Sequence, residues 1–450
     1  MTRHWRRLSG GLALGIGLAL AGAGVAQAAP LLAHQTTLEL DGAASSWILT
    51  STALVLLMTL PGLALFYGGM VRRKNVIATI TQSLGVAAVV TLAWFAAGYS
   101  LSFGIGQPIG GLTGEEVQPW IGSLQSAFLN GVTPTTAHSL TAGLPEYLWI
   151  AYQLTFAIIT PALIAGAFAE RLKYSGLLLF TALWTLFVYA PICHWVWGGG
   201  FLGSAGVLDF AGGAVVHVNS GVAGLVCAIF LGARKGYGKD PTIMAHNPVL
   251  TMIGACLLLV GWIGFNAGSA WTPDSIASVA LLNTILAAMA GSLTWKIVEI
   301  IEKRKPSLIG VLSGMIAGLV AITPAAGLVD PKGAVIIGLA SGPVCYAASV
   351  WIKKLLRYDD SLDAFGIHGA GGILGALLTG VFASAAVNSV GEGADIMKQA
   401  WGLGVTIAWS AVVTFIILVI CKFTTGLRVS EAQEAEGLDT HLHGEALEAP

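Results

Sequence analysis

Two histidines in apolar stretches are the residues of this sequence best suited to chemistry. Asp209 precedes His217 by eight residues, and Asp360 precedes His368 by the same spacing. The pattern D-x7-H-x3-G-x2-G therefore occurs twice. A pair of neutral imidazoles can share a proton without a permanent charge, because each ring offers one donor and one acceptor. A single histidine of this kind is more often a packing residue bonded to a backbone carbonyl, but the matched pair favours a shared function.

Enzyme and metal chemistry receive little support from the residues around these histidines. A metal site needs three or four ligands, and the sequence contains neither an HExxH motif nor a Cys/His cluster. The five cysteines lie in apolar runs without CxxC spacing, which favours packing roles. We therefore expect a protein that is not an enzyme, with no catalytic residues, metal or cofactor.

The composition indicates the surroundings of these histidines. Of the 450 residues, 55% are hydrophobic and 10% are charged, whereas about 25% are charged in soluble domains. This balance excludes a soluble protein, and the 59 glycines suit closely packed membrane helices. The net charge of −1 provides no field that would attract nucleic acid. An ionisable group inside a membrane is costly, which makes both histidines functional candidates.

Apolar stretches of about 20 residues recur, each long enough to cross a hydrocarbon layer of roughly 30 Å. Residues 1–28 are predicted to be a signal peptide, since three arginines precede an apolar stretch and Ala26-Gln27-Ala28 provides a cleavage site. An uncleaved first helix is the alternative. Residues 29–423 are predicted to form an all-α transmembrane domain, and 424–450 a solvated cytoplasmic tail. The eleven predicted spans are 46–70, 76–102, 147–169, 175–198, 211–233, 248–271, 276–298, 307–329, 333–352, 362–385 and 399–421.

Lys and Arg residues predict the orientation of these spans. One set of alternating loops and span ends contains 17 of them, whereas the opposite set contains only Lys332 and Lys398. Because basic loops remain on the cytoplasmic side, the mature N-terminus is predicted outside and the tail inside. Signal cleavage would also leave an external N-terminus, so two independent cues agree.

A second repeated pattern supports an internal repeat. The pattern G-x3-F-x2-G occurs at Gly62, Phe66 and Gly69 in the first span, and it occurs again at 261–268 in the sixth. Spans one to five therefore resemble spans six to ten. Because five is odd, the second copy crosses the membrane with opposite polarity. Inverted repeats of this kind place a transport site near the midplane, where the two halves meet.

The aspartates of the repeated pattern have two open roles. Asp209 stands at the outer start of a helix, where its carboxylate can cap backbone N–H groups or handle a cation or proton. Asp359, Asp360 and Asp363 stand at the equivalent inner helix start and have the same ambiguity. Helix capping and cation handling therefore both remain hypotheses for these residues.

Aromatic residues lie near the outer surface. Trp197 ends the fourth span, and Phe265 and Ser269 share one face of the sixth because they are four residues apart. A tryptophan face attracts small cations. The other reading of Trp197 is an interfacial belt residue, which explains most of the 14 tryptophans.

The stretch DFAGGAVVHVNSGVAGLVCAIFLGAR at 209–234 closely resembles the signature of the Amt/Mep/Rh ammonium transporter family, in particular its bacterial Amt branch. Four further blocks resemble family motifs in the expected order. They are AFAERLK (167–173), HWVWGGG (194–200), GFNAGSA (264–270) and DAFGIHGAGG (363–372). The resemblance extends from residue 46 into the tail.

This resemblance implies a homotrimer in the cell inner membrane, in which each subunit of eleven helices has its own pore between two pseudosymmetric halves. Tyr152 departs from the family pattern, where many relatives carry Phe. By resemblance, the matching positions are Trp197, Ser269, Phe156 and Asp209 for outer ammonium binding, Phe156 and Phe265 for the gate, His217 and His368 for the pore lining, and Asp360 and Asp363 for the inner vestibule.

The implied chemistry agrees with the residue types. A Trp face and a Ser hydroxyl would hold ammonium at the outer site. The ion would lose its proton before the apolar constriction, because a bare cation costs far more there than neutral ammonia. Potassium cannot lose a proton, and a TVGYG carbonyl filter is absent from the sequence. The proton would be carried separately.

Partners and rival functions follow from the same resemblance. The tail is expected to pack under neighbouring subunits, and the inner face is expected to accept a PII-type signal protein as well as to contact membrane lipid. A receptor-like ammonium sensor and a neutral-gas channel of the Rh type are the alternatives. An intramembrane enzyme is a third alternative, but it lacks a nucleophile or metal motif.

Overall fold

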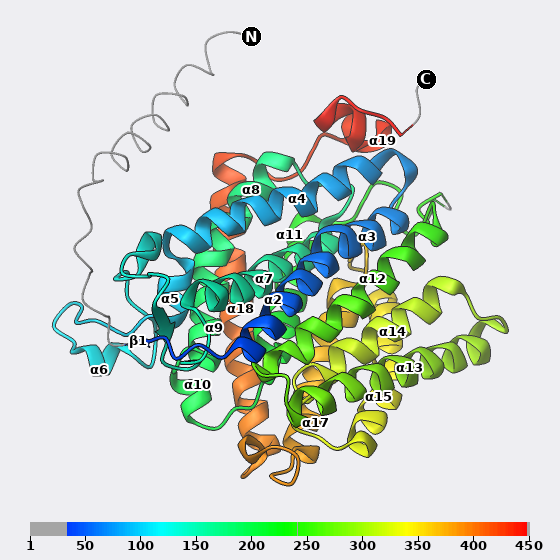
Figure 1. Cartoon of the computed structure of the whole chain (residues 1–450). Helices are drawn as coiled ribbons and strands as arrows, with labels where there is room; N and C mark the ends of the chain where they lie inside the picture. The colour runs from blue at the N-terminus through cyan, green and yellow to red at the C-terminus, as the bar shows by residue number, and fades with distance from the viewer. Residues whose placement is uncertain (1–33, 241, 448–450) are drawn as a thin grey trace, which may run out of the picture.

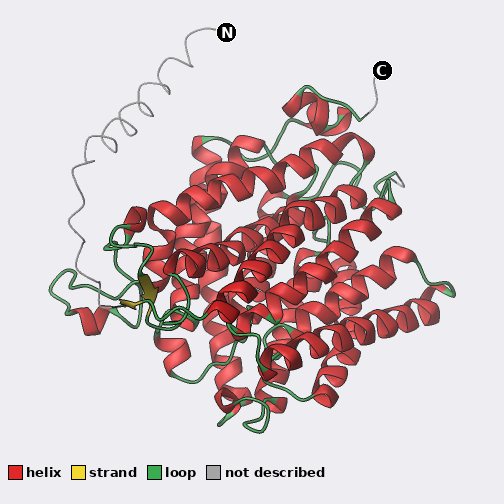
Figure 2. Ribbon diagram, viewed as in Figure 1, coloured by secondary structure: helices red, strands yellow, loops and turns green. Residues whose placement is uncertain are grey.

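The computed structural model describes residues 34–240 and 242–447. The predicted signal peptide therefore lies outside the described residues. The described chain is a bundle of long helices, with a small antiparallel sheet of β1 (Gln35–Thr37) and β2 (Thr136–His138) at one side (Figure 1; Figure 2). We call this side the sheet face.

The opposite side carries the short helix α19 (Glu431–Glu436), and we call it the tail face (Figure 1). Ten helical segments in the described ranges are long and apolar enough to cross a membrane. The eighth predicted span corresponds to α14 (Leu308–Ile322), which has only 15 residues and is almost wholly buried. A buried turn continues it, so protein surrounds the non-helical backbone.

The two halves of the chain have matching element orders. The first five spans contain α2 (Gly42–Leu57) with α3 (Ala64–Met70), α4 (Val76–Ala93) with α5 (Tyr99–Phe103), α7 (Glu146–Ile164), α8 (Tyr174–Trp184) with α9 (Ala190–Val196), and η7 (Gly213–Val218) with α11 (Asn219–Leu231). The next five contain α12 (Pro248–Asn266), α13 (Ser275–Lys303), α14, α15 (Pro331–Tyr346) with α16 (Lys353–Leu356), and η10 (Ala364–Gly369) with α17 (Ala370–Phe382); α18 (Ile396–Thr424) is the last span.

The glycines of the repeated pattern lie where the two halves cross. A Cβ added at Gly372 of α17 would lie 3.0 Å from the carbonyl oxygen of Gly213, and one added at Gly221 of α11 would collide with the backbone of Gly369. Likewise, a Cβ at Gly62 would lie 3.3 Å from the backbone nitrogen of Leu258 in α12. The spacings found in the sequence therefore mark close backbone contacts between the repeats.

Each histidine of the repeated pattern lies in a π-helical turn at the start of a helix. His217 is the fifth residue of η7 and His368 the fifth residue of η10. Each turn follows a residue in the left-handed region, Gly212 at φ 116° and Asp363 at φ 59°. Single π-helical turns are rare in proteins overall, and those that occur are often found at functional sites. The sequence pattern therefore predicts a repeated local geometry, which the two halves share.

The two aspartates cap these turns, to different degrees. Both carboxylate oxygens of Asp209 accept two N–H bonds each, from Gly212 and Gly213 on Oδ1 and from Ala214 and Val215 on Oδ2, at 2.5–3.0 Å. The Asp360 carboxylate accepts two N–H bonds, from the first two residues of η10, at 3.0 and 2.8 Å. Helix capping is thus a geometric fact for both aspartates.

Buried ion pairs connect the loops of the tail face. Arg234 pairs with Glu170 at 3.0 Å and with Asp359 at 2.8 Å, and Arg72 pairs with Glu170 at 3.0 Å. Burial alone would raise the pKa of Asp359 and of Glu170, but the arginines outweigh it and hold both pKa values below their usual range. Asp359 is therefore a partner of Arg234 in a network that joins four loops.

The tail packs on this network, which its composition did not predict. Glu434 is fully buried and accepts bonds from the backbone N–H of Lys235 at 2.6 Å and from Arg428 at 2.8 Å. Asp439 accepts a 2.8 Å bond from the N–H of Ala78. The expectation of a solvated tail is wrong for this segment, because its acidic residues bond to groups of the tail face.

Gly221→Ala should destabilise the protein, because the new methyl group would collide with the Gly369 backbone. Overpacking of this kind costs about 1–3 kcal/mol. The control is Gly404→Ala in α18, where a Cβ would meet nothing within 4 Å and where helix propensity favours Ala by about 0.5–1 kcal/mol. The measurement is the melting temperature of each purified variant in detergent. Equal melting temperatures would contradict the close contact.

Asp209→Asn should lower the melting temperature more than Asp360→Asn. Asparagine retains one acceptor oxygen, so Asp209→Asn removes two of four N–H acceptor bonds and Asp360→Asn one of two. Each buried N–H left without an acceptor costs about 1–3 kcal/mol. Thermal unfolding of both variants in one detergent provides the comparison. A stable Asp209→Asn protein would show that capping does not require both oxygens.

Candidate functional site

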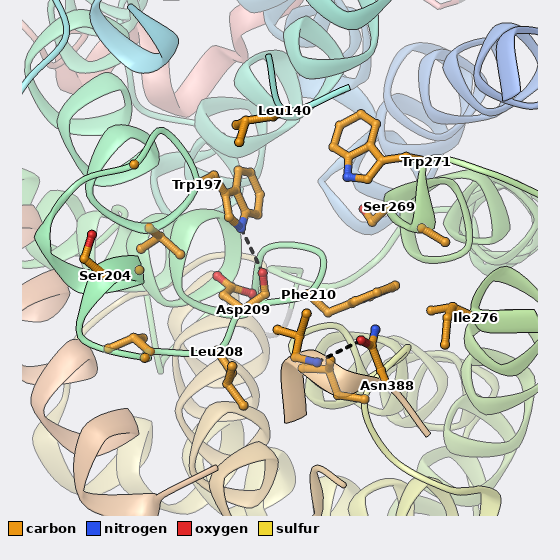
Figure 3. A pocket seen from close by; sticks show the side chains of 18 of the residues that line it. Leu140, Trp197, Ser204, Leu208, Asp209, Phe210, Ser269, Trp271, Ile276 and Asn388 are labelled. Carbon is orange, nitrogen blue, oxygen red and sulfur yellow. Dashed lines mark hydrogen bonds between the residues drawn. The ribbon is translucent and has the colours of Figure 1, made fainter. Parts of the chain in front are cut away.

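A cavity opens on the sheet face, above the turn that carries His217. Two adjoining pockets of about 800 and 450 Å³ share eight lining residues, and we call them together the vestibule. Figure 3 shows Trp197, Ser269 and Trp271 around the cavity, with Asp209 and Phe210 on its floor. The lining is mostly apolar, with a few polar groups, as is typical of small-molecule sites.

Trp197 is held firmly at the edge of the vestibule. It follows α9, and its indole Nε1 donates a 2.8 Å hydrogen bond to the backbone carbonyl of Asp209 (Figure 3). Its ring meets Phe156 edge-on, with centroids 5.7 Å apart. Because both ends of the indole are fixed, its ring surface is presented to the cavity in one orientation.

Ser269 presents acceptor capacity to the vestibule. Its Oγ donates to the carbonyl of Phe265 at 2.9 Å, which commits its single proton and leaves lone pairs for an incoming N–H. The Tyr152 hydroxyl donates to the Gly264 carbonyl at 2.9 Å and lies 3.5 Å from Ser269 Oγ. Tyr152 is fully buried, so its departure from Phe anchors the end of α12 and adds no exposed polar group.

The Asp209 carboxylate lies beneath this site, with its oxygens directed at the backbone of η7. Burial raises the pKa of Asp209, while its four backbone N–H bonds act in the opposite direction. Since both oxygens already accept two bonds, the side chain organises the floor of the vestibule. A ligand in the vestibule would contact the backbone carbonyl of Asp209 and the Trp197 ring that this carbonyl orients.

Two stacked phenylalanines close the bottom of the vestibule. The rings of Phe156 and Phe265 lie 4.3 Å apart at an interplanar angle of 25°, and both are buried. The ring of His217 follows Phe265 at 6.1 Å. The structure therefore places Trp197, the phenylalanine pair and the histidine pair in sequence from the sheet face inward.

The two histidines are in direct contact. Their Nδ1 atoms are 3.3 Å apart and their rings are 5.3 Å apart at 23°. A hydrogen bond between these atoms requires one ring to donate and the other to accept, so two neutral rings must adopt opposite tautomers. His217 Nε2 is buried and has no hydrogen-bond partner among the described residues, which leaves one polar atom available to a small molecule.

The inner aspartates lie at the start of η10, the turn that carries His368. Burial, with the neighbouring Asp363 carboxylate, raises the pKa of Asp360. Asp363 itself forms an ion pair with Lys353. The two residues predicted for an inner vestibule are therefore adjacent, but one is a helix cap and the other a salt-bridge partner. Within 34–240 and 242–447, no three His, Cys, Asp or Glu side chains meet as a metal site.

Sequence reasoning missed part of the vestibule. Trp271 and Trp149 line it, as do Leu140, Phe210 and Val390 from distant loops. Trp271 lies two residues after Ser269 and directly follows the GFNAGSA block, which is a signal that could have identified it. Phe210 follows Asp209 in the 209–234 stretch, whereas Leu140 and Val390 come from segments without a recognisable motif, and the fold alone brings these two to the vestibule.

Comparison with known proteins is consistent with this geometry. A profile of the Ammonium Transporter Family matches residues 46–447. The ammonium transporter of Bacillus subtilis is 47% identical over 400 residues, which cover 87% of this chain and 95% of that protein. The ammonium transporter of Aquifex aeolicus is 45% identical over 418 residues, covering 92% and 95%. The crystal structure of Saccharomyces cerevisiae Mep2 is similar with a TM-score of 0.78 and 36% identity, covering 87% of this chain and 90% of that one.

The profile match over most of the chain and the identity to these relatives agree with the repeated histidine turns and the apolar helix bundle. This chain therefore belongs to the Ammonium Transporter Family and is a multi-pass membrane transporter of ammonium rather than an enzyme.

Proposed function

We propose that the vestibule recruits the ammonium ion and that the path beyond the phenylalanine pair conducts neutral ammonia. The supporting observation is the order of groups along the path. A π-rich rim and a hydroxyl acceptor come first, then two stacked apolar rings, then two imidazoles in mutual contact. Each step suits one chemical form of the substrate.

Recruitment depends on interactions that favour a small cation. The face of Trp197 attracts a cation by about 0.5–2 kcal/mol, and Ser269 Oγ accepts an N–H bond from ammonium. The Asp209 carboxylate lies buried below them, where it contributes negative charge and fixes the backbone of the vestibule floor by hydrogen bonds. A channel for a neutral gas needs none of these groups, so they favour ammonium over the Rh-type alternative.

Deprotonation follows from the energetics of the constriction. Phe156 and Phe265 are 1% and 0% exposed, and a bare cation between them would lose its hydration without compensation. Neutral ammonia loses far less hydration free energy at this position, and the histidine pair offers it polar contacts. Potassium binds to similar groups but cannot release a proton, so it is rejected at the same position. The proton travels separately.

We also propose an orientation and an assembly. The basic loops lie on the tail face, which is therefore cytoplasmic, and the sheet face with its vestibule is periplasmic in the cell inner membrane. Exposed apolar side chains along α13, including Leu282, Met289 and Leu293, suit packing against lipid or against neighbouring subunits in a homotrimer. A PII-type signal protein at the tail face would cover the cytoplasmic end of each pore.

Trp197→Leu should weaken the apparent affinity for ammonium, because it removes the aromatic face and retains an apolar side chain. A loss of up to about 2 kcal/mol corresponds to a roughly 30-fold higher half-saturation. The assay is methylammonium uptake into proteoliposomes, with ammonium as the competitor. The control is Trp401→Leu, since Trp401 is 47% exposed on α18 and does not line the vestibule. Equal half-saturation in both variants would show that Trp197 is an interfacial belt residue and not part of the ammonium site.

The histidine pair should behave as one unit. His217→Ala and His368→Ala should each slow ammonium transport, and the double variant should be little worse than either, since contacting residues are not additive. A carboxylate at either position should admit potassium, because it can stabilise an intact cation. Current recording on solid-supported membranes with ammonium and potassium measures both effects. Additive losses, with potassium still excluded from His217→Asp and His368→Asp, would make the histidines separate packing residues.

A further inference from the structure

Trp271 occupies an unusual position for a tryptophan. It follows the short turn η8 (Gly268–Ala270) and has a φ of 68°, in the left-handed region that favours glycine. A bulky residue with this backbone is a strained outlier, and such outliers cluster at functional sites. The chain therefore retains a large ring where a residue without a side chain would adopt the conformation more easily.

The ring of Trp271 forms part of the vestibule wall. It lies across the cavity from Trp197, above Ser269 (Figure 3). Tyr152 meets it edge-on at 5.4 Å, Phe156 meets Tyr152 edge-on at 5.1 Å, and Trp197 meets Phe156 at 5.7 Å. These four rings make a continuous arc that begins and ends in an indole.

Neighbouring rings hold Trp271 in place. Trp149 stacks on it with centroids 4.3 Å apart at 27°, and His138 of β2 stacks on the other side of Trp149 at 5.1 Å and 5°. The following residues are also restrained, because Asp274 accepts N–H bonds from Ile276 and Ala277 at the start of α13. Trp271 therefore has little freedom to swing out of the cavity.

We propose that Trp271 is a specificity-determining residue, the second aromatic wall of the ammonium site opposite Trp197. This inference rests on the proposed recruitment of ammonium at the vestibule. An ion between two fixed indoles gains a second cation–π contact, which raises affinity. The same fixed wall limits the width of the site, so it disfavours ammonium ions that carry additional methyl groups. Trp271 thus acts on both affinity and size selection.

The test compares three replacements by competition against methylammonium uptake in proteoliposomes, with ammonium and dimethylammonium as competitors. Trp271→Leu should raise the half-inhibiting concentration of ammonium by about 2- to 30-fold. It should also lower the ratio of the dimethylammonium value to the ammonium value, because the site is wider. Trp271→Phe, which keeps an aromatic face, should be intermediate. Trp401→Leu is the matched control outside the vestibule and should leave both values unchanged.

Trp271→Gly separates the ring from the backbone. Glycine removes the wall and relieves the positive φ, so this variant should lose affinity as Trp271→Leu does even where it folds as well as the parent protein. Melting temperatures in detergent report folding independently of transport. If all three variants keep the parental ammonium value and the parental ratio while only melting temperatures change, Trp271 is a packing residue and the proposal is overturned.

Trp197→Leu distinguishes this failure from failure of the proposed function. If Trp197→Leu weakens ammonium competition while the Trp271 variants do not, recruitment at the vestibule stands and the role of Trp271 is rejected. If neither position affects competition, the vestibule is not the recruitment site, and both proposals are rejected. A change in the competitor ratio for Trp271 variants alone supports size selection by this ring, since loss of packing would not alter it.

Discussion

The contact between His217 and His368 depends on a condition that the whole bundle must meet. Two Nδ1 atoms at 3.3 Å form a hydrogen bond only when one ring donates and the other accepts. The rings come from opposite ends of the membrane, on π-helical turns in different halves of the chain. They can meet only if each helix packs at backbone distance on the turn of the other half, α11 on η10 and α17 on η7, which the glycines at 221 and 372 permit. The close crossing of the repeats is thus the constraint on which the path depends.

Buried polar groups at both ends of the path are also paired with partners. On the sheet face, the Asp209 carboxylate accepts four backbone bonds and fixes the turn that carries His217. On the tail face, Arg234 connects Glu170 to Asp359 and so joins loops of the two halves. Because unpaired groups of this kind cost several kcal/mol when buried, the apolar centre and the polar ends are mutually dependent.

Much of this architecture could be predicted from the sequence, for physical reasons that differ by residue. Apolar length predicts spans, and the spacing of Asp209, His217 and their counterparts predicts a repeated turn, because local sequence determines local geometry. The double role considered for Asp209 could not be resolved, since four N–H acceptor bonds depend on a backbone path. Trp271 was missed because its stacking partner Trp149 is distant in sequence. The contacts of the tail with its own subunit were missed because composition reports average polarity and not specific partners.

The docked tail also imposes an order on the maturation of the chain. Arg428 donates to the carbonyl of Leu231 at 2.8 Å, and the two residues are 197 positions apart. At about 5–20 residues per second, a ribosome needs roughly 10–40 s to synthesise the intervening chain. During that interval the carbonyl of Leu231 and the backbone N–H of Lys235, which later bonds Glu434, await their partners. Closure of the tail face is consequently a late step in the folding of the chain, and a chain that ends before Arg428 would leave these backbone groups without their tail partners.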